Sequence, residues 1–193
     1  MWWSYIWLNE GIATLYDVYI PSLLFPEYDF MERFVAISMP QAFRLDALST
    51  TWSMNHYTEI PSELWTKFNS IVYEKAACVL RMFQEAMTIP TFTEGLRHYF
   101  NKMNFTAAVP EDLYESLQFA YDADFPANDW HIGRLFDMWA SQAGYPMISI
   151  ERVANRFLLT QKRHRVNNGE IYAVPVTFAT KTSKNFDEKT PKV

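Results

Sequence analysis

The sequence predicts a mainly α-helical protein that ends in a small β unit. Up to Ala143, apolar residues recur at spacings of three and four, which is typical of packed helices. After Pro146 the pattern changes to short apolar runs, which favour strands. Fifteen Phe, eleven Tyr and seven Trp against only five Gly indicate a densely packed interior.

The first helix is predicted from Ser4 to about Tyr19, with apolar residues on both of its sides. A helix that is apolar all round is typical of a buried position. Pro21 and Pro26 are expected to close it, because proline cannot donate a backbone hydrogen bond.

A second helix is predicted from Tyr28 to about Ala36, continuing past Pro40 toward Leu48 with a kink or break. The Ser, Thr, Asn and Pro of positions 49–62 indicate a loop. A strong helix follows from about Ile71 to Met87, and its apolar stretch contains the lone cysteine, Cys78, which we expect to be a buried, inert thiol.

The remaining elements are shorter and are bounded by Pro and Gly. Three helices are predicted at 92–103, 110–122 and 130–143. Three strands are predicted at 147–153, 156–160 and 171–178, the last two separated by a turn around 167–169. The tail from Thr180 onward is polar and is expected to fray or to form a loop.

Glu10 is the residue of the first helix that most needs a partner. It lies on the stripe formed by Trp3, Ile6 and Trp7, so we expect a buried carboxylate. An unpaired buried charge is strongly destabilising, and the candidate partners are an Arg or Lys side chain, a backbone cap, or a metal ion. Asp17 lies on the same stripe and raises the same question.

The residues around Glu10 form a specific motif. The string WWSYIWLNEGIA at 2–13 resembles the WW-x-x-x-WLNEG-x-A segment of the aminopeptidase N-like zinc metallopeptidases, the gluzincin aminopeptidases. The string FNSIVYEKAA at 68–77 is similar to F-D-x-I-x-Y-x-K-G-A of the same family. Further matches follow in the family's order at Leu45-Asp46-Ala47-Leu48, Phe92-x-x-Gly95-Leu96-x-x-Tyr99 and Met138-x-x-x-x-x-Gly144-Tyr145-Pro146.

The resemblance implies a fold and a site. Residues 1–146 would be the C-terminal helical part of a thermolysin-like catalytic domain, and residues 147–193 the start of a β-sandwich domain. Glu10 would be the third ligand of a catalytic zinc ion, and Tyr73 the catalytic tyrosine that donates a hydrogen bond to the oxyanion. From the residues alone, the alternative for Tyr73 is a core tyrosine with a satisfied hydroxyl. No substrate-binding residue is assigned.

Other parts of the family's site are expected to lie outside this chain. The resemblance places the His-Glu-x-x-His motif, with two zinc ligands and the general base, before Met1, together with the Gly-x-Met-Glu-Asn loop that holds the substrate's α-amine. The sequence departs from the family's pattern at two places near the expected substrate pocket: Ala76 stands where the family has glycine, and Thr51-Trp52-Ser53 where many members have Ser-His-Pro. The histidines of the chain lack the mutual spacing of a zinc motif: His56, His98, His131 and His164.

Two functional hypotheses follow. The first is a zinc-dependent aminopeptidase that removes N-terminal residues from peptides, with this chain as a fragment that is inactive alone. The alternative is a non-catalytic binding or receptor-type protein that keeps the scaffold without the metal centre. Peptide substrates are the expected partners.

Charge and hydropathy limit the other function classes. A net charge of -5 disfavours nucleic-acid binding. The sequence contains no apolar stretch of membrane-spanning length. A location at the plasma membrane or outside the cell is implied by the resemblance alone.

Overall fold

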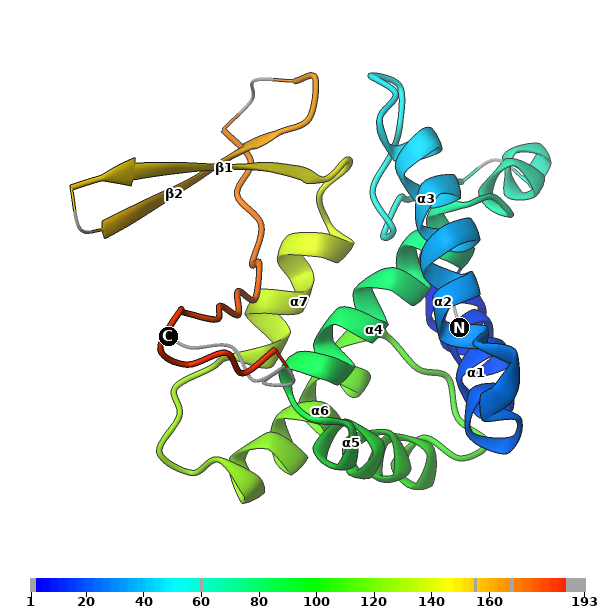
Figure 1. Cartoon of the computed structure of the whole chain (residues 1–193). Helices are drawn as coiled ribbons and strands as arrows, with labels where there is room; N and C mark the ends of the chain where they lie inside the picture. Colours follow the sequence, from blue (N-terminus) through cyan, green and yellow to red (C-terminus); the bar gives the residue numbers. More distant parts are fainter. Residues whose placement is uncertain (1–2, 60, 155, 167–168, 187–193) are drawn as a thin grey trace.

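The computed structural model confirms a mainly helical chain that leads into antiparallel strands (Figure 1). The structure describes residues 3–59, 61–154, 156–166 and 169–186. In chain order its elements are η1 (Trp3–Tyr5), α1 (Trp7–Leu24), η2 (Pro26–Tyr28), α2 (Phe30–Arg33), η3 (Phe34–Ser38), α3 (Met39–Asp46), η4 (Pro61–Lys67), η5 (Ile71–Lys75), α4 (Ala76–Ala86), α5 (Ile89–Lys102), α6 (Pro110–Asp124), α7 (Ile132–Ala140), β1 (Pro146–Val153) and β2 (Arg156–Arg163).

Helix α1 is longer than the sequence predicted. It continues through Pro21 to Leu24, so the prediction that Pro21 closes the helix is wrong. A proline in the last turn removes only one backbone donor, and the N–H of Phe25 still bonds to the carbonyl of Pro21 at 2.8 Å.

The prediction that α1 is buried on all sides is also wrong for the described residues. Its buried side is formed by Trp7, Leu8, Gly11 and Leu15. The covering comes from η5 and α4, which pack along one side of the helix. Asp17 is therefore exposed and needs no partner, whereas Glu10, at the edge of the covered side, is half-buried.

The second predicted helix runs from Phe30 to Asp46, and a π turn takes the place of the expected kink or break. In η3 the N–H of Met39 bonds to the carbonyl of Phe34, five residues earlier. This wider turn directly precedes Pro40, which has no N–H to contribute to a regular helix. Helix α3 ends by burying Asp46.

The core is built around Phe136 of α7. Its fully buried ring stacks on Phe83 of α4, with 4.2 Å between ring centroids, and on Trp7 of α1 at 5.9 Å. The indole N–H of Trp7 donates to Asn55 Oδ1 at 2.7 Å, and the backbone N–H of Asn55 donates to the carbonyl of Ala140 at 2.9 Å. The predicted loop is thereby fixed to both α1 and α7.

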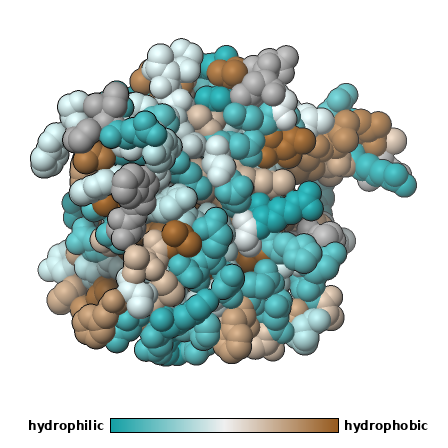
Figure 2. All heavy atoms as spheres, turned by 180° about the vertical axis from the view of Figure 1, so that it is seen from behind, coloured by the Kyte–Doolittle hydropathy of each residue, from teal (hydrophilic) through white to brown (hydrophobic). Residues whose placement is uncertain are grey.

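Strands β1 and β2 form a hairpin in which Pro146 lies opposite Arg163 and Val153 opposite Arg156. The hairpin projects from the helical part (Figure 1), and most of its residues are exposed. Figure 2 shows apolar side chains gathered on this projection, at the upper right of the view. The large exposed apolar residues of the hairpin are Met147, Ile148, Ile150, Val153, Phe157, Leu158 and Leu159.

The segment 171–178, predicted as a third strand, is not a strand. Side chains rather than a β-ladder bond its backbone. The Gln161 amide bonds both the N–H and the carbonyl of Tyr172 at 2.9 Å, and the indole of Trp139 donates to the carbonyl of Ala173 at 2.6 Å. The predicted turn around 167–169 lies mostly outside the described residues, and the domain boundary after position 146 stays a prediction.

Candidate active site

Glu10 and Tyr73 lie side by side, although 63 positions separate them in the sequence. Glu10 is in the first turn of α1, and Tyr73 is in the middle of η5. The Tyr73 hydroxyl lies close enough to the Glu10 carboxylate for the two groups to interact. Burial, and after it the charge of Glu10, raises the pKa of the Tyr73 phenol above its ordinary value. The phenol therefore stays neutral, and able to donate, at physiological pH.

Gly11 allows α1 to lie close to the start of α4, next to η5. A Cβ atom at Gly11 would lie 2.5 Å from the Cβ of Ala76 and 3.2 Å from Cδ1 of Leu80. Carbon atoms in contact prefer about 3.5–4.0 Å, so any larger residue at position 11 would push α1 away from the start of α4. The adjacent Glu10 reaches Tyr73 because this crossing is so close.

Tyr73 is carried by a π turn rather than by the regular helix that the sequence predicted. The N–H of Lys75 bonds to the carbonyl of Ser70, five residues earlier, at 2.8 Å. The N–H of Ile71 bonds to Asn69 Oδ1, also at 2.8 Å, which fixes the start of the turn. Single π turns occur frequently at functional sites. Apolar periodicity does not distinguish such a turn from an α-helix, so the π turn could not be predicted from the sequence.

Aromatic rings surround Phe68 next to Tyr73. Phe68 lies 6.5 Å from the Tyr73 ring, 6.2 Å from Trp3 and 6.0 Å from Trp65, measured between centroids. Trp65 is 80% exposed and Trp3 is 43% exposed. These rings offer an accessible apolar surface beside the carboxylate, which can contact an apolar ligand.

The sequence left three kinds of partner open for the Glu10 carboxylate: an Arg or Lys side chain, a backbone cap and a metal ion. Within the described part of the chain, no Lys, Arg or His forms an ion pair with Glu10. A half-buried carboxylate whose neighbour is a neutral phenol remains free to bind a cation, and carboxylate oxygens are ordinary zinc ligands.

A complete metal site is not present among the described residues, where no group of three His, Cys, Asp or Glu side chains comes together. Three of the histidines stack on other rings instead, with centroid separations of 5.1, 4.5 and 5.0 Å: His56 on Trp52, His98 on Phe119 and His164 on Tyr145. The fourth, His131, directly precedes α7.

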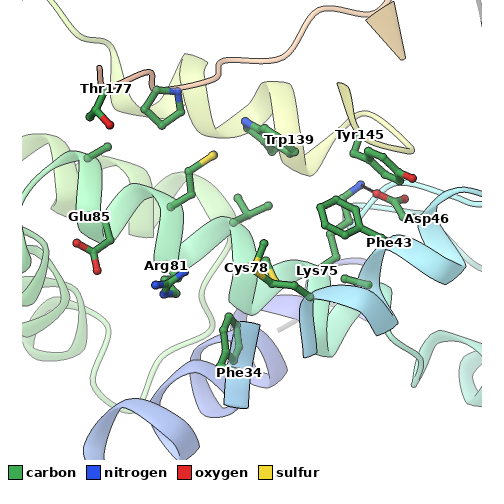
Figure 3. A pocket seen from close by; sticks show the side chains of 16 residues that line it. Phe34, Phe43, Asp46, Lys75, Cys78, Arg81, Glu85, Trp139, Tyr145 and Thr177 are labelled. Atoms are coloured by element: carbon green, nitrogen blue, oxygen red, sulfur yellow. Dashed lines mark ion pairs between the residues drawn. The ribbon is translucent and has the colours of Figure 1, made fainter. Parts of the chain in front are cut away.

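Sequence reasoning missed a buried ion pair close to Tyr73. Lys75 Nζ lies 2.9 Å from Asp46 Oδ2, and the two side chains are 4% and 3% exposed. Figure 3 shows this pair at one end of a cavity beside α4. The available signal was that Asp46 and Lys75 both lie in strings that match the family motifs.

Comparisons with known proteins place the chain among the peptidases. The family model described as the Peptidase family M1 domain matches residues 1–139, and the chain belongs to this family. Relatives over nearly the whole chain carry the names of aminopeptidases.

Aminopeptidase N of Plutella xylostella is 31% identical over 196 residues, which cover 98% of this chain and 21% of the relative. Leucyl aminopeptidase of Saccharolobus solfataricus is 31% identical, covering 91% and 22%. Membrane alanyl aminopeptidase of Manduca sexta is 27% identical, covering 98% and 20%. The chain thus spans about a fifth of the length of these curated relatives. Among the described residues, no helix has the length and apolarity to cross a bilayer.

Proposed function

We propose that this chain is part of a zinc-dependent aminopeptidase that removes N-terminal residues from peptides. In this proposal Glu10 is a zinc ligand and Tyr73 is the hydrogen-bond donor to the oxyanion. The observation that carries it is the pairing of Glu10 and Tyr73: a half-buried carboxylate, without an ion-pair partner among the described residues, lies beside a neutral phenol.

The donor set of the chain fits one part of a zinc site. Catalytic zinc sites with two His and one Glu are common, and Glu10 supplies the carboxylate. The two histidines would come from residues outside this chain, since its own histidines are placed elsewhere. When bound, the metal polarises the scissile carbonyl and makes hydroxide available near neutral pH.

Tyr73 would supply the second element of the chemistry. Its phenol donates without adding a charge to the ground state, and its raised pKa keeps the proton in place. One preorganised donor to an oxyanion is worth about 3–4 kcal/mol in the transition state. The Tyr73 hydroxyl lies beside Glu10, so it is the donor that an oxyanion next to Glu10 would use.

The proposal includes the substrate class and the setting. Peptides with free N-termini are the expected substrates, and the aromatic surface around Phe68 is available to contact an apolar side chain of one. A location at the plasma membrane or outside the cell belongs to the proposal, as does the arrangement of a catalytic helical part at 1–146 followed by the start of a β-sandwich domain at 147–193.

A hybrid enzyme tests the two roles directly. In the hybrid, residues 1–193 replace the matching segment of the Plutella xylostella aminopeptidase N. We expect zinc binding and hydrolysis of alanine p-nitroanilide. Glu10→Gln should lose the zinc, while Tyr73→Phe should keep it and lower kcat by about 10²–10³-fold. Matched controls are Asp17→Asn, an exposed carboxylate on the same helix, and Tyr57→Phe, an exposed tyrosine.

Three results would contradict the proposal. Full zinc occupancy after Glu10→Gln removes the ligand role, and an unchanged kcat after Tyr73→Phe removes the oxyanion role. A folded, zinc-loaded hybrid that binds peptide without hydrolysing it supports the non-catalytic binding protein instead. If the large exchange prevents folding, a smaller one carrying only residues 1–86 applies the same test, because Glu10, Gly11 and Tyr73 all lie within it.

A further inference from the structure

Three of the family-like strings, one of them the string that contains Tyr73, meet at one buried point through residues that have no role in the proposed chemistry. Asp46 comes from the Leu-Asp-Ala-Leu string at the end of α3, and Lys75 from the string that contains Tyr73. Gly144 comes from the Gly-Tyr-Pro string after α7. Lys75 Nζ lies 2.9 Å from Asp46 Oδ2 and 2.9 Å from the carbonyl oxygen of Gly144. We call Asp46, Lys75 and Gly144 the clamp.

The clamp satisfies both of its charges. The Lys75 ammonium has three donors, which reach Asp46, the carbonyl of Gly144 and, at 3.4 Å, the carbonyl of Gln142. The other carboxylate oxygen of Asp46 accepts hydrogen bonds from the N–H of Gly144 at 2.9 Å and from Thr51 Oγ1 at 3.3 Å. Each member of the clamp thus bonds to the other two, which fixes the end of α3, the π turn and the chain after α7 relative to one another.

A cavity borders the clamp. A cavity of about 480 Å³ lies between α3 and α4, lined by Phe43, Val79 and Met82 among others, with Asp46 and Lys75 in its wall (Figure 3). Side chains that border a cavity lose contacts on that side. The ion pair lies at the wall of this cavity and joins η5 to α3.

The clamp holds the turn that carries Tyr73. Lys75 is two residues after Tyr73 in η5 and is bonded to α3 and Gly144, whereas Tyr73 reaches Glu10 on α1. A shift of Lys75 would therefore move the phenol relative to the carboxylate. A misplacement of about 1 Å costs on the order of 10²-fold in rate when a group must meet a transition state.

We propose that Lys75, held by Asp46 and Gly144, is a positioning residue that sets the place of the Tyr73 hydroxyl. This inference rests on the proposed role of Tyr73. Lys75 itself touches no reacting atom, and its charge serves to anchor the π turn. Removing the clamp should then cost transition-state stabilisation through Tyr73 and through nothing else.

The test is a double-mutant cycle in the hybrid enzyme. The neutral variant D46N/K75M removes both charges together, because a single change would leave one buried charge unpaired. We expect kcat for alanine p-nitroanilide to fall about 10- to 100-fold, with KM and zinc content unchanged. In the Tyr73→Phe background the same pair of changes should alter kcat less than about twofold, since groups that act together are not additive. The control K102M/E115Q removes an exposed ion pair elsewhere.

Two kinetic outcomes overturn the inference: an unchanged kcat in D46N/K75M, or an equal loss of kcat with and without the Tyr73 hydroxyl, which marks a purely structural pair. An unchanged kcat in Tyr73→Phe alone is a different failure, that of the proposed function. Should D46N/K75M not fold in the hybrid, the full chain labelled with ¹³C at tyrosine Cζ gives a second readout. The Tyr73 resonance is identified as the one that Y73F removes and E10Q shifts. This resonance should move in D46N/K75M and stay in place in K102M/E115Q. A resonance that stays in place in D46N/K75M also overturns the inference.

Discussion

Replacing Gly11 with alanine should destabilise the protein, although alanine normally favours a helix. The new Cβ would lie 2.5 Å from the Cβ of Ala76, which belongs to the facing helix and cannot rotate away. A normal contact requires about 1 Å more, so α1 and α4 must separate. Overpacking of this kind costs about 1–3 kcal/mol, and the better helix propensity of alanine returns at most about 1 kcal/mol. We expect a net loss of about 1–2 kcal/mol.

The pair Gly11 and Ala76 offers a reciprocal test. Ala76→Gly alone should cost about 1 kcal/mol in helix propensity. G11A/A76G restores one methyl group and one hydrogen at the crossing, so the double variant should be more stable than the sum of the single changes by about 1–3 kcal/mol. Gly133→Ala is the matched control, because its Cβ would meet Tyr114 Cβ at 3.4 Å, near an ordinary contact distance.

Urea unfolding followed by circular dichroism measures these free energies, and the melting temperature should fall by about 2–4 °C per kcal/mol for a chain of this size. In the hybrid enzyme, G11A should also lower kcat, because Glu10 moves away from Tyr73 with the helix. Equal stability of G11A and G133A, or strict additivity in G11A/A76G, would refute the reasoning about the close crossing.

Three further outcomes are expected. Phe136→Ala should lower the free energy of unfolding by about 3–5 kcal/mol, measured in urea, because the fully buried ring stacks on Phe83 and leaves a cavity. Burial raises the pKa of Cys78 to about 12, so the rate of its reaction with iodoacetamide should keep rising tenfold per pH unit beyond pH 9, whereas the unfolded chain levels off near its ordinary pKa. Tyr172→Phe should cost about 1–2 kcal/mol and increase amide exchange in 169–177, because the hydroxyl bonds to the carbonyl of Ala143 at 2.7 Å.

The helices could be predicted from the sequence because their signals are local. Apolar spacing and the proline positions placed every α-helix from Ile71 onward to within a few residues of its ends. The error at Pro21 has a physical reason. A proline stops a helix where the lost donor must be replaced, but in the last turn, next to solvent, the loss is small.

The segment 171–178 shows that a local apolar pattern does not report whether a neighbouring strand is present. Its apolar residues predict a strand, but a strand needs a neighbouring backbone, and the nearest groups are side chains. Gln161 places its amide where a β-ladder would place a peptide group, so the donors and acceptors of Tyr172 are satisfied without a sheet. Which partner a backbone finds is a property of the tertiary fold, and a single sequence does not contain it in readable form.

The candidate site also contains residues that could be predicted from the sequence and residues that could not. The motif strings predicted Glu10 and Tyr73, and the structure places the two together, while their roles stay predictions. The clamp could not be derived from spacing, because Asp46, Lys75 and Gly144 are far apart in the chain and meet only through the crossing of three elements. Besides the motif strings, a Lys within an apolar helical stretch was a local sign that an acidic partner had to exist.

The half-burial of Glu10 and the bare side of α1 have one cause. Apolar residues lie on both sides of the helix, and the described residues cover only one, which leaves large apolar side chains exposed at its C-terminal end: Ile20, Leu23, Leu24 and Phe25. A surface that extends along α1 to its first turn would also remove water from Glu10. Its charge would then cost more to keep without a cation, because the neutral phenol of Tyr73 carries no positive charge. The drier the site becomes, the more strongly it should favour a bound metal ion over an unpaired carboxylate.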